Sequence, residues 1–177
     1  MNRGVFLDRD GVLNRATVRD GVPRAAATLD ELEILDDARS GCATLRDAGF
    51  LLICVTNQAE ISRGGIRARD VEAIHAKLAS ELGLDEVVVC PHDDGDDCPC
   101  RKPRPGMIVA AALRHEIDLS RSFTVGDRWR DVEAGRNAGT QTVFVDRDYD
   151  ESLTVAPDAV VSGLEEASQW IIQHPPR

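Results

Sequence analysis

The chain has 177 residues, of which 42% are hydrophobic and 29% charged, a balance typical of a globular protein. Its formal net charge of −10 argues against a nonspecific binder of nucleic acid or acidic membranes, because both need a basic surface. No apolar run reaches the about 18 residues of a membrane span, and the run from Val5 to Leu7 is too short for a signal-peptide core. We therefore predict a cytoplasmic protein that binds neither nucleic acid nor membrane.

Short apolar runs alternate with longer helical patterns along the chain. The runs are β-branched or bulky and do not alternate with polar residues, as expected of strands buried on both faces. In chain order we predict a strand at 5–7, a helix at 36–48, a strand at 50–55, a helix at 67–82, a strand at 87–89, a helix at 106–117, a strand at 123–125, a helix at 129–138, a strand at 142–145 and a helix at about 163–173. This order predicts one α/β domain over residues 1–177, with a parallel sheet and helices on both faces.

Polar side chains follow four of the predicted strands. Asp8 follows the first strand, Thr56 and Asn57 follow the second, Cys90 ends the third and Asp127 follows the fourth. The ligand crevice of an open parallel sheet lies outside the carboxyl ends of its strands. We therefore expect these side chains to meet at one edge of the sheet.

Acidic residues dominate two of these strand ends. Asp8 and Asp10 are two residues apart, so one can act as a nucleophile while the other donates and recovers a proton. Asp127 and Asp131 form a second acidic pair, at the start of the predicted helix 129–138. Each pair also has a simpler interpretation. Asp-Gly at 10–11 is typical of a turn, and Asp127 or Asp131 can cap a helix. Together, the carboxyl groups of Asp8, Asp10, Asp127 and Asp131 form a set of hard oxygen ligands suited to Mg²⁺.

Groups that can hold a phosphoryl oxygen lie nearby in the predicted fold. Thr56 and Asn57 offer a hydroxyl and an amide, and Arg101 and Lys102 offer two cations. Taken alone, Thr56 could cap a helix or turn, and the basic pair could be solvated on the surface.

Three of the five cysteines fall within eleven residues and form the pattern C-x-H-x5-C-x-C with Cys90, His92, Cys98 and Cys100. Four such ligands fit a closed tetrahedral zinc site. A redox pair of Cys98 and Cys100 is the alternative, but it leaves Cys90 and His92 without a role. We predict a structural zinc ion that stabilises this polar loop.

The remaining cysteines and histidines lack a matching partner in the sequence. Cys42 lies in a helical pattern and Cys54 in an apolar run, so we predict core thiols. We predict structural or surface roles for His75, His115 and His174.

These segments together resemble the haloacid dehalogenase superfamily of phosphohydrolases. FLDRDGVLN is similar to its first motif, VTNQ to its second, CRKPRPGM to its third and VGDRWRDVEAGRNAGT to its fourth. The CPH…CPCRKP loop resembles the branch that holds heptose bisphosphate phosphatases and histidinol phosphatases. The resemblance covers residues 5 to about 146 and implies a Rossmann-like sheet without a separate cap domain, its site walled by the zinc loop and by the segment after Asn14.

The resemblance also implies the catalytic roles. Asp8 would form an aspartyl-phosphate and Asp10 would be the general acid and base, while Thr56 and Lys102 would stabilise the transferring phosphoryl group. Asp8, Asp127 and the backbone carbonyl of Asp10 would bind Mg²⁺.

Substrate contacts follow from the same resemblance, which assigns them to Asn57, Arg101, Lys102 and Arg128. The implied reaction is removal of the 7-phosphate of D-glycero-D-manno-heptose 1,7-bisphosphate by a monomer, with histidinol phosphate or another small phosphate ester as the alternative. Ala59-Glu60 after the second motif and the long stretch 16–28 depart from the common pattern, and both border the expected sugar site. A phospho-accepting receiver module or a catalytically silent zinc module is the alternative of a different class.

Overall fold

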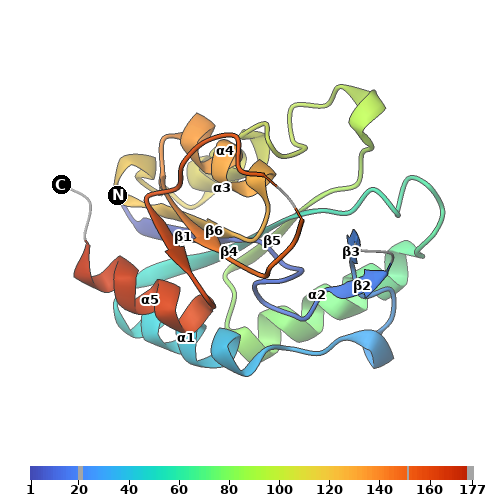
Figure 1. Ribbon diagram of the computed structural model, residues 1–177, viewed down its shortest axis with the longest axis horizontal. Helices are drawn as coiled ribbons and strands as arrows, with labels where there is room; N and C mark the ends of the chain where they lie inside the picture. The colour runs from blue at the N-terminus through green and yellow to red at the C-terminus, as the bar shows by residue number, and fades with distance from the viewer. Residues whose placement is uncertain (20–21, 151, 175–177) are drawn as a thin grey trace.

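The computed structural model describes residues 1–19, 22–150 and 152–174. Its main element is a parallel six-stranded sheet with strand order β5-β4-β1-β6-β7-β8 (Figure 1). The strands are β1 Arg3–Leu7, β4 Phe50–Asn57, β5 Glu86–Cys90, β6 Phe123–Gly126, β7 Gln141–Val145 and β8 Ala159–Val161, and a separate antiparallel hairpin pairs β2 Thr17–Arg19 with β3 Val22–Arg24.

Helices pack on both faces of the sheet, as predicted. They are α1 Asp36–Asp47, α2 Ala68–Leu82, α3 Gly106–Arg114, α4 Trp129–Ala138 and α5 Leu164–Gln173, with 3₁₀ turns at η1 Leu29–Glu31, η2 Asp94–Asp96 and η3 Leu119–Arg121. One buried cluster joins the sheet to α1, α2 and α5, and a second joins it to α3 and α4. No helix in the described ranges is both long and apolar enough to cross a membrane.

The five predicted strands and five predicted helices are all present, with small differences at their ends. The helix expected over 106–117 ends at Arg114, because Glu116 adopts a left-handed backbone conformation with φ of 52° and directs Ile117 into a bridge with Asn2. The β2–β3 hairpin was not predicted, since its strands have three residues each and lack a distinct apolar pattern, and the edge strand β8, a three-residue apolar run, was also missed.

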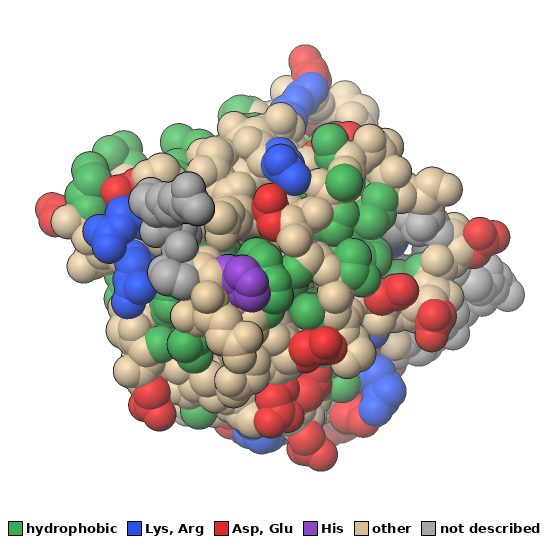
Figure 2. Space-filling view, turned by 60° about the vertical axis from the view of Figure 1, so that its left-hand side comes forward, with side chains coloured by type: hydrophobic (Ala, Val, Ile, Leu, Met, Phe, Trp, Pro, Cys, Tyr) green, Lys and Arg blue, Asp and Glu red, His purple; other side chains and the backbone are tan. Residues whose placement is uncertain are grey.

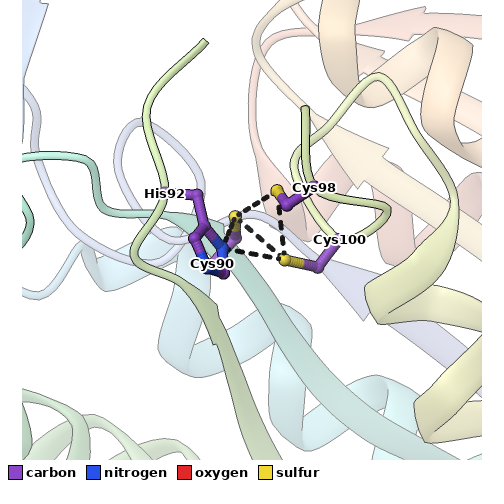
Figure 3. A group of neighbouring side chains, drawn as sticks. All are labelled: Cys90, His92, Cys98 and Cys100. Carbon is purple, nitrogen blue, oxygen red and sulfur yellow. Dashed lines mark hydrogen bonds between the residues drawn. The ribbon is translucent and has the colours of Figure 1, made fainter. Parts of the chain in front are cut away.

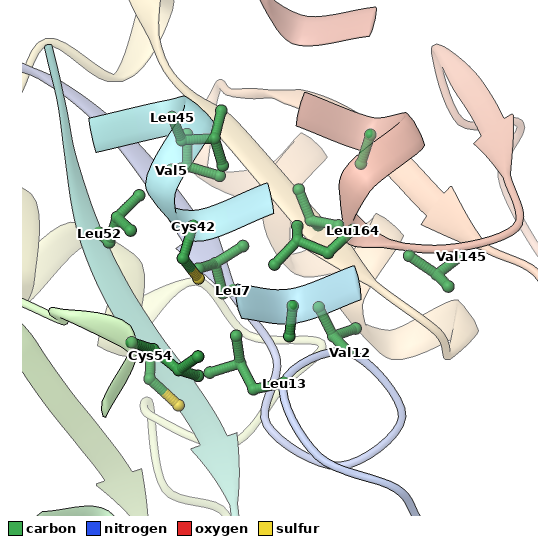
Figure 4. Close-up of a cluster of buried hydrophobic side chains, with 14 of the residues drawn as sticks. Val5, Leu7, Val12, Leu13, Cys42, Leu45, Leu52, Cys54, Val145 and Leu164 are labelled. Carbon is green, nitrogen blue, oxygen red and sulfur yellow. The ribbon is translucent and has the colours of Figure 1, made fainter. Parts of the chain in front are cut away.

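The core between the sheet and α1 explains why the chain folds around its central strands. Leu45 and Cys42 from α1 face Leu52 and Cys54 from β4, and all four side chains are fully buried (Figure 4). The prediction that both thiols are core residues is confirmed. On the face shown in Figure 2, acidic side chains gather along the lower edge, in keeping with the net negative charge.

The strand register brings the predicted site to one edge. Leu7 at the end of β1 pairs with Cys54 of β4 on one side and with Val125 of β6 on the other. β1 ends at this level, whereas β4 continues to Asn57 beside β5 and β6 continues to Gly126 beside β7. This register places Asp8 beside the polar ends of β4 and β6.

Truncation of Leu45 tests the importance of the α1 core. We expect Leu45→Ala to lower the free energy of unfolding by about 2–5 kcal/mol, because it leaves a cavity in a fully packed layer. Urea denaturation measures this change. Leu113→Ala is the matched control: Leu113 is 82% exposed, so its loss should change stability by less than about 0.5 kcal/mol. Equal effects of the two substitutions would contradict this core assignment.

Candidate active site

A cavity of about 560 Å³ opens at the carboxyl edge of the sheet. It is lined by every residue predicted from the sequence to act in catalysis, substrate binding or magnesium binding: Asp8, Asp10, Thr56, Asn57, Arg101, Lys102, Asp127 and Arg128. The segment after Asn14 contributes Ala25, Ala27 and Glu31 to its wall, as expected, whereas residues 90–100 of the zinc loop do not line it directly. Five separate segments of the chain, near residues 8–10, 25–31, 56–66, 101–102 and 127–131, therefore converge at one cavity.

A buried ammonium group lies at the base of this cavity. Lys102 Nζ is 2.6 Å from Asp8 Oδ1 and 2.6 Å from Asp131 Oδ1, and it donates to the backbone oxygen of Val55 at 2.8 Å. Burial opposes the charge on Lys102, but the carboxylates of Asp131 and Asp8 outweigh that effect and raise its pKa. The lysine therefore carries a fixed positive charge against Asp8.

Asp8 is 9% exposed and stands directly after β1. Burial raises its pKa to about 6, while the Lys102 ammonium acts in the opposite direction. At neutral pH, the carboxyl group is therefore largely ionised while its burial leaves it poorly hydrated. A poorly hydrated carboxylate beside a cation is suited to nucleophilic attack.

Asp127 supplies an unsatisfied carboxyl group on the other side of Asp8. Within the described residues, neither of its oxygens accepts a hydrogen bond of ordinary geometry, although the side chain is only 1% exposed and the Tyr149 hydroxyl lies close to it. Burial and the neighbouring Asp8 and Asp131 raise its pKa well above the ordinary value. Carboxylate oxygens of Asp8, Asp127 and Asp131 lie within 4.8 Å of one another, which is a donor set that fits Mg²⁺.

Gly11 allows this close approach of the loop after β1 to Asp127. Its φ of +93° lies in the left-handed region, and a Cβ at this position would stand 1.8 Å from Asp127 Oδ2. Any side chain would therefore displace the candidate metal ligand.

The carboxyl group of Asp10 lies apart from the acidic cluster. It accepts hydrogen bonds from Arg9, Asn14 and Gln58, each at 3.0–3.1 Å. The sequence assigned Asp10 and Asp131 to the same set of four acidic residues. In the structure, the carboxyl group of Asp131 lies in the buried cluster and that of Asp10 does not. The carboxyl group of Asp10 is thus separated from those of Asp8, Asp127 and Asp131, while the residue still lines the cavity.

Two polar residues at the end of β4 organise their neighbours. Asn57 exchanges two hydrogen bonds with the backbone of Lys102, one in each direction and both at 3.1 Å. Gln58, which sequence reasoning did not single out, donates from Nε2 to Thr56 Oγ1 at 2.8 Å and also to Asp10. Asn57 therefore holds the loop that carries the lysine, and Gln58 connects the threonine to the second aspartate.

Arginine side chains form the rim of the cavity. Arg101 and Arg130 both donate to Asp94 Oδ1, at 2.6 and 2.7 Å, and Arg63 makes two 2.6 Å hydrogen bonds to Asp93. Arg128 lines the same cavity, with its guanidinium 6.0 Å from the centre of the Tyr149 ring. Basic groups are thus gathered at the mouth, three of them paired with carboxylates of the loop 90–100.

The predicted zinc ligands meet at the base of this loop (Figure 3). The three Sγ atoms of Cys90, Cys98 and Cys100 are 3.2–3.6 Å apart, and His92 Nδ1 lies 3.3 Å from Cys100 Sγ and 3.6 Å from Cys90 Sγ. Tetrahedral zinc bonds of about 2.3 Å to sulfur place such ligands roughly 3.8 Å apart. The donor set and its spacing therefore fit one zinc ion with four protein ligands.

Comparison with known proteins identifies the relatives of this chain. A model of the HAD-hydrolase-like family matches residues 99–167. The D-glycero-D-manno-heptose-1,7-bisphosphate 7-phosphatase of Thermosynechococcus vestitus is 35% identical over 193 residues, covering 96% of this chain and 95% of that protein. The D-glycero-beta-D-manno-heptose-1,7-bisphosphate 7-phosphatase of Pseudomonas aeruginosa is 37% identical over 148 residues, covering 80% and 79%.

A solved structure shares the whole fold. The D,D-heptose 1,7-bisphosphate phosphatase from B. bronchiseptica, crystallised with magnesium and phosphate, superimposes with a TM-score of 0.84 at 30% identity, covering 97% of this chain and 98% of that one. The resemblance inferred from the motifs is confirmed by these matches. The chain belongs to the HAD-like hydrolases and, among them, to the family of the D-glycero-D-manno-heptose-1,7-bisphosphate 7-phosphatases.

Proposed function

We propose that this chain removes the 7-phosphate of D-glycero-D-manno-heptose 1,7-bisphosphate through an aspartyl-phosphate on Asp8. The observation that carries the proposal is the pairing of the buried Asp8 carboxylate with Lys102 at 2.6 Å, beside the unsatisfied carboxyl group of Asp127. Family membership supports the same reaction.

In the first step, an Asp8 oxygen attacks the phosphorus atom and the bond from phosphorus to the sugar oxygen breaks. Asp10 donates a proton to the leaving oxygen, so heptose 1-phosphate departs as a neutral alcohol at carbon 7. Lys102 and the Thr56 hydroxyl lie in the cavity wall where they can stabilise the charge on the phosphoryl oxygens.

In the second step, water attacks phosphorus and the bond to Asp8 breaks. Asp10, now deprotonated, accepts a proton from that water, which restores both aspartates and releases inorganic phosphate. An adjacent proton donor and acceptor distinguishes this site from a receiver module that keeps its phosphate.

Asp8, Asp127 and the backbone carbonyl of Asp10 would hold Mg²⁺, which supplies charge neutralisation for the phosphoryl group when bound. Asp131 is committed to Lys102 and to the backbone N–H of Arg128, at 2.6 and 3.0 Å. We assign Asp131 to holding the lysine.

The rim favours a substrate with a second phosphate. The 7-phosphate of a heptose projects on a primary carbon and can reach Asp8 while the ring stays at the mouth, near Arg101, Arg128 and Arg130. Guanidinium groups bind phosphate with two parallel hydrogen bonds. Histidinol phosphate has no second phosphate for these arginines to bind.

Zinc would act here as a structural ion. Its four protein ligands leave no position for substrate, and Cys100 is followed directly by Arg101 and Lys102. Bound zinc would therefore fix the segment that carries the catalytic lysine. Free thiols clustered in this way also favour the reducing cytoplasm as the compartment of the protein.

Replacement of either aspartate after β1 tests the assigned chemistry. We expect Asp8→Asn to lower turnover by at least about a thousandfold, and Asp10→Asn to lower it by about 10²–10⁴-fold, because the first loses the nucleophile and the second the proton donor. Phosphate release measures both. Asp47→Asn, at an exposed position on α1, is the matched control and should keep full activity. Full activity of Asp8→Asn, after deamidation has been excluded by mass spectrometry, would overturn the assignment.

Metal analysis tests the zinc site separately. We expect one zinc ion per purified chain, and Cys98→Ala should lose it because a tetrahedral site loses one of its four ligands. Cys42→Ala, which removes a buried thiol distant from this cluster, should retain zinc. Unchanged zinc content in Cys98→Ala would show that these four residues do not form the site.

A substrate panel tests specificity. We expect the highest kcat/KM for D-glycero-D-manno-heptose 1,7-bisphosphate, with phosphate lost from carbon 7, and lower values for sugar monophosphates and histidinol phosphate. Phosphate assays with NMR of the product identify both the rate and the position. A higher kcat/KM for histidinol phosphate, or loss of phosphate from carbon 1, would refute the substrate but not the phosphatase activity.

A further inference from the structure

The most deeply buried charged side chain near the site belongs to Arg9, between the two aspartates. Arg9 is 0% exposed, yet it carries a guanidinium group that no step of the proposed reaction uses. A buried guanidinium is costly unless its donors find partners. The contacts of Arg9 therefore show what it stabilises.

Arg9 joins the loop after β1 to the middle of α2. Its Nε donates to Asp10 Oδ2 at 3.0 Å and its Nη2 to Asp10 Oδ1 at 3.1 Å, so both carboxyl oxygens are held by one planar group. Its Nη1 lies 3.0 Å from Nε2 of His75. Because arginine has only donors, His75 must accept at this atom.

His75 is well suited to act as that acceptor. The side chain is 9% exposed on α2, and burial, together with Arg9, lowers its pKa to about 4. The ring is therefore neutral at neutral pH, with its proton on Nδ1 and Nε2 free to accept from Arg9. The helix thus fixes the guanidinium, and the guanidinium fixes the plane of the Asp10 carboxyl group.

The other donors to Asp10 indicate which oxygen meets the substrate. Asn14 donates to Oδ1 from inside the fold, where it is 0% exposed, and Gln58 donates to Oδ2 from the cavity wall. Gln58 also donates to Thr56, so its contact with Asp10 is the one that a leaving-group oxygen can replace. Arg9 and Asn14 would remain in place and keep Oδ2 directed at the cavity.

We propose that Arg9 and His75 are positioning residues that hold the Asp10 carboxyl group in the orientation needed to protonate the leaving oxygen. The proposal rests on the proposed function, since it concerns the proton donor of that reaction. It gives a role to a histidine that the sequence placed among structural residues.

The leaving group separates a positioning role from a merely structural one. A sugar alkoxide needs a proton as it departs, whereas p-nitrophenolate is a stable anion and leaves without one. A loss of proton-donor geometry therefore lowers kcat/KM for the sugar phosphate far more than for p-nitrophenyl phosphate. Damage to the fold lowers both values together.

We expect His75→Leu and Arg9→Lys each to lower kcat/KM for D-glycero-D-manno-heptose 1,7-bisphosphate about tenfold or more, and for p-nitrophenyl phosphate less than about twofold. His75→Gln, whose amide oxygen can accept from Arg9, should restore the sugar-phosphate value to within about threefold of wild type. His115→Leu, which removes a histidine paired with Glu86, is the control and should change neither value. Arg9→Lys leaves His75 intact, so it carries the test where His75→Leu fails to fold.

Equal losses on the two substrates, or no loss in either variant, would overturn the positioning role while leaving the proposed phosphatase intact. Failure of His75→Gln to exceed His75→Leu would also count against it. A wild-type protein that releases phosphate from neither compound would refute the proposed function and this inference together.

Discussion

The ion pairs of Lys102 with Asp8 and Asp131 are the interaction on which the site depends. One buried ammonium faces three buried carboxyl groups when Asp127 is included, so full ionisation leaves two uncompensated negative charges. Either Asp127 takes a proton, as its raised pKa indicates, or a divalent cation enters. The repulsion among these carboxylates is unfavourable in the metal-free protein. It therefore favours the binding of Mg²⁺ and, with it, of a phosphate ester.

The position of this lysine depends on elements distant from it in the sequence. Lys102 lies two residues after Cys100, and Asn57 at the end of β4 holds its backbone through two hydrogen bonds. The loop 90–100 has many aspartates and little apolar surface, so burial alone cannot order it. A zinc ion at its base would therefore act on catalysis indirectly, through the lysine, and on substrate binding through the carboxylates that hold the rim arginines.

Much of the site could be predicted because the residues with reactive side chains directly follow the predicted strands. Non-alternating apolar runs predicted the parallel strands, and the carboxyl ends of parallel strands meet at one edge, so Asp8, Thr56 and Asp127 could be placed together. The four zinc ligands lie close along the chain, and their spacing alone indicated the cluster.

What the sequence did not reveal depends on tertiary packing. Asp131 and Asp10 both looked like members of one acidic set, and only the structure separates the partner of Lys102 from the partner of Arg9. His75 gives no local signal of its contact with Arg9, since the two are 66 residues apart and meet because α2 packs beneath the loop after β1. The pairing of rim arginines with Asp93 and Asp94 likewise requires the folded loop.

In the proposed reaction, Asp8 carries the phosphoryl group during turnover. Rapid acid quench of the enzyme with its bisphosphate substrate, followed by peptide mass spectrometry, can detect this covalent intermediate. We expect a transient, base-labile phosphate on the peptide that contains Asp8, formed and lost at rates compatible with turnover. Turnover without a covalent phosphate, or a phosphate attached to another residue, would contradict it.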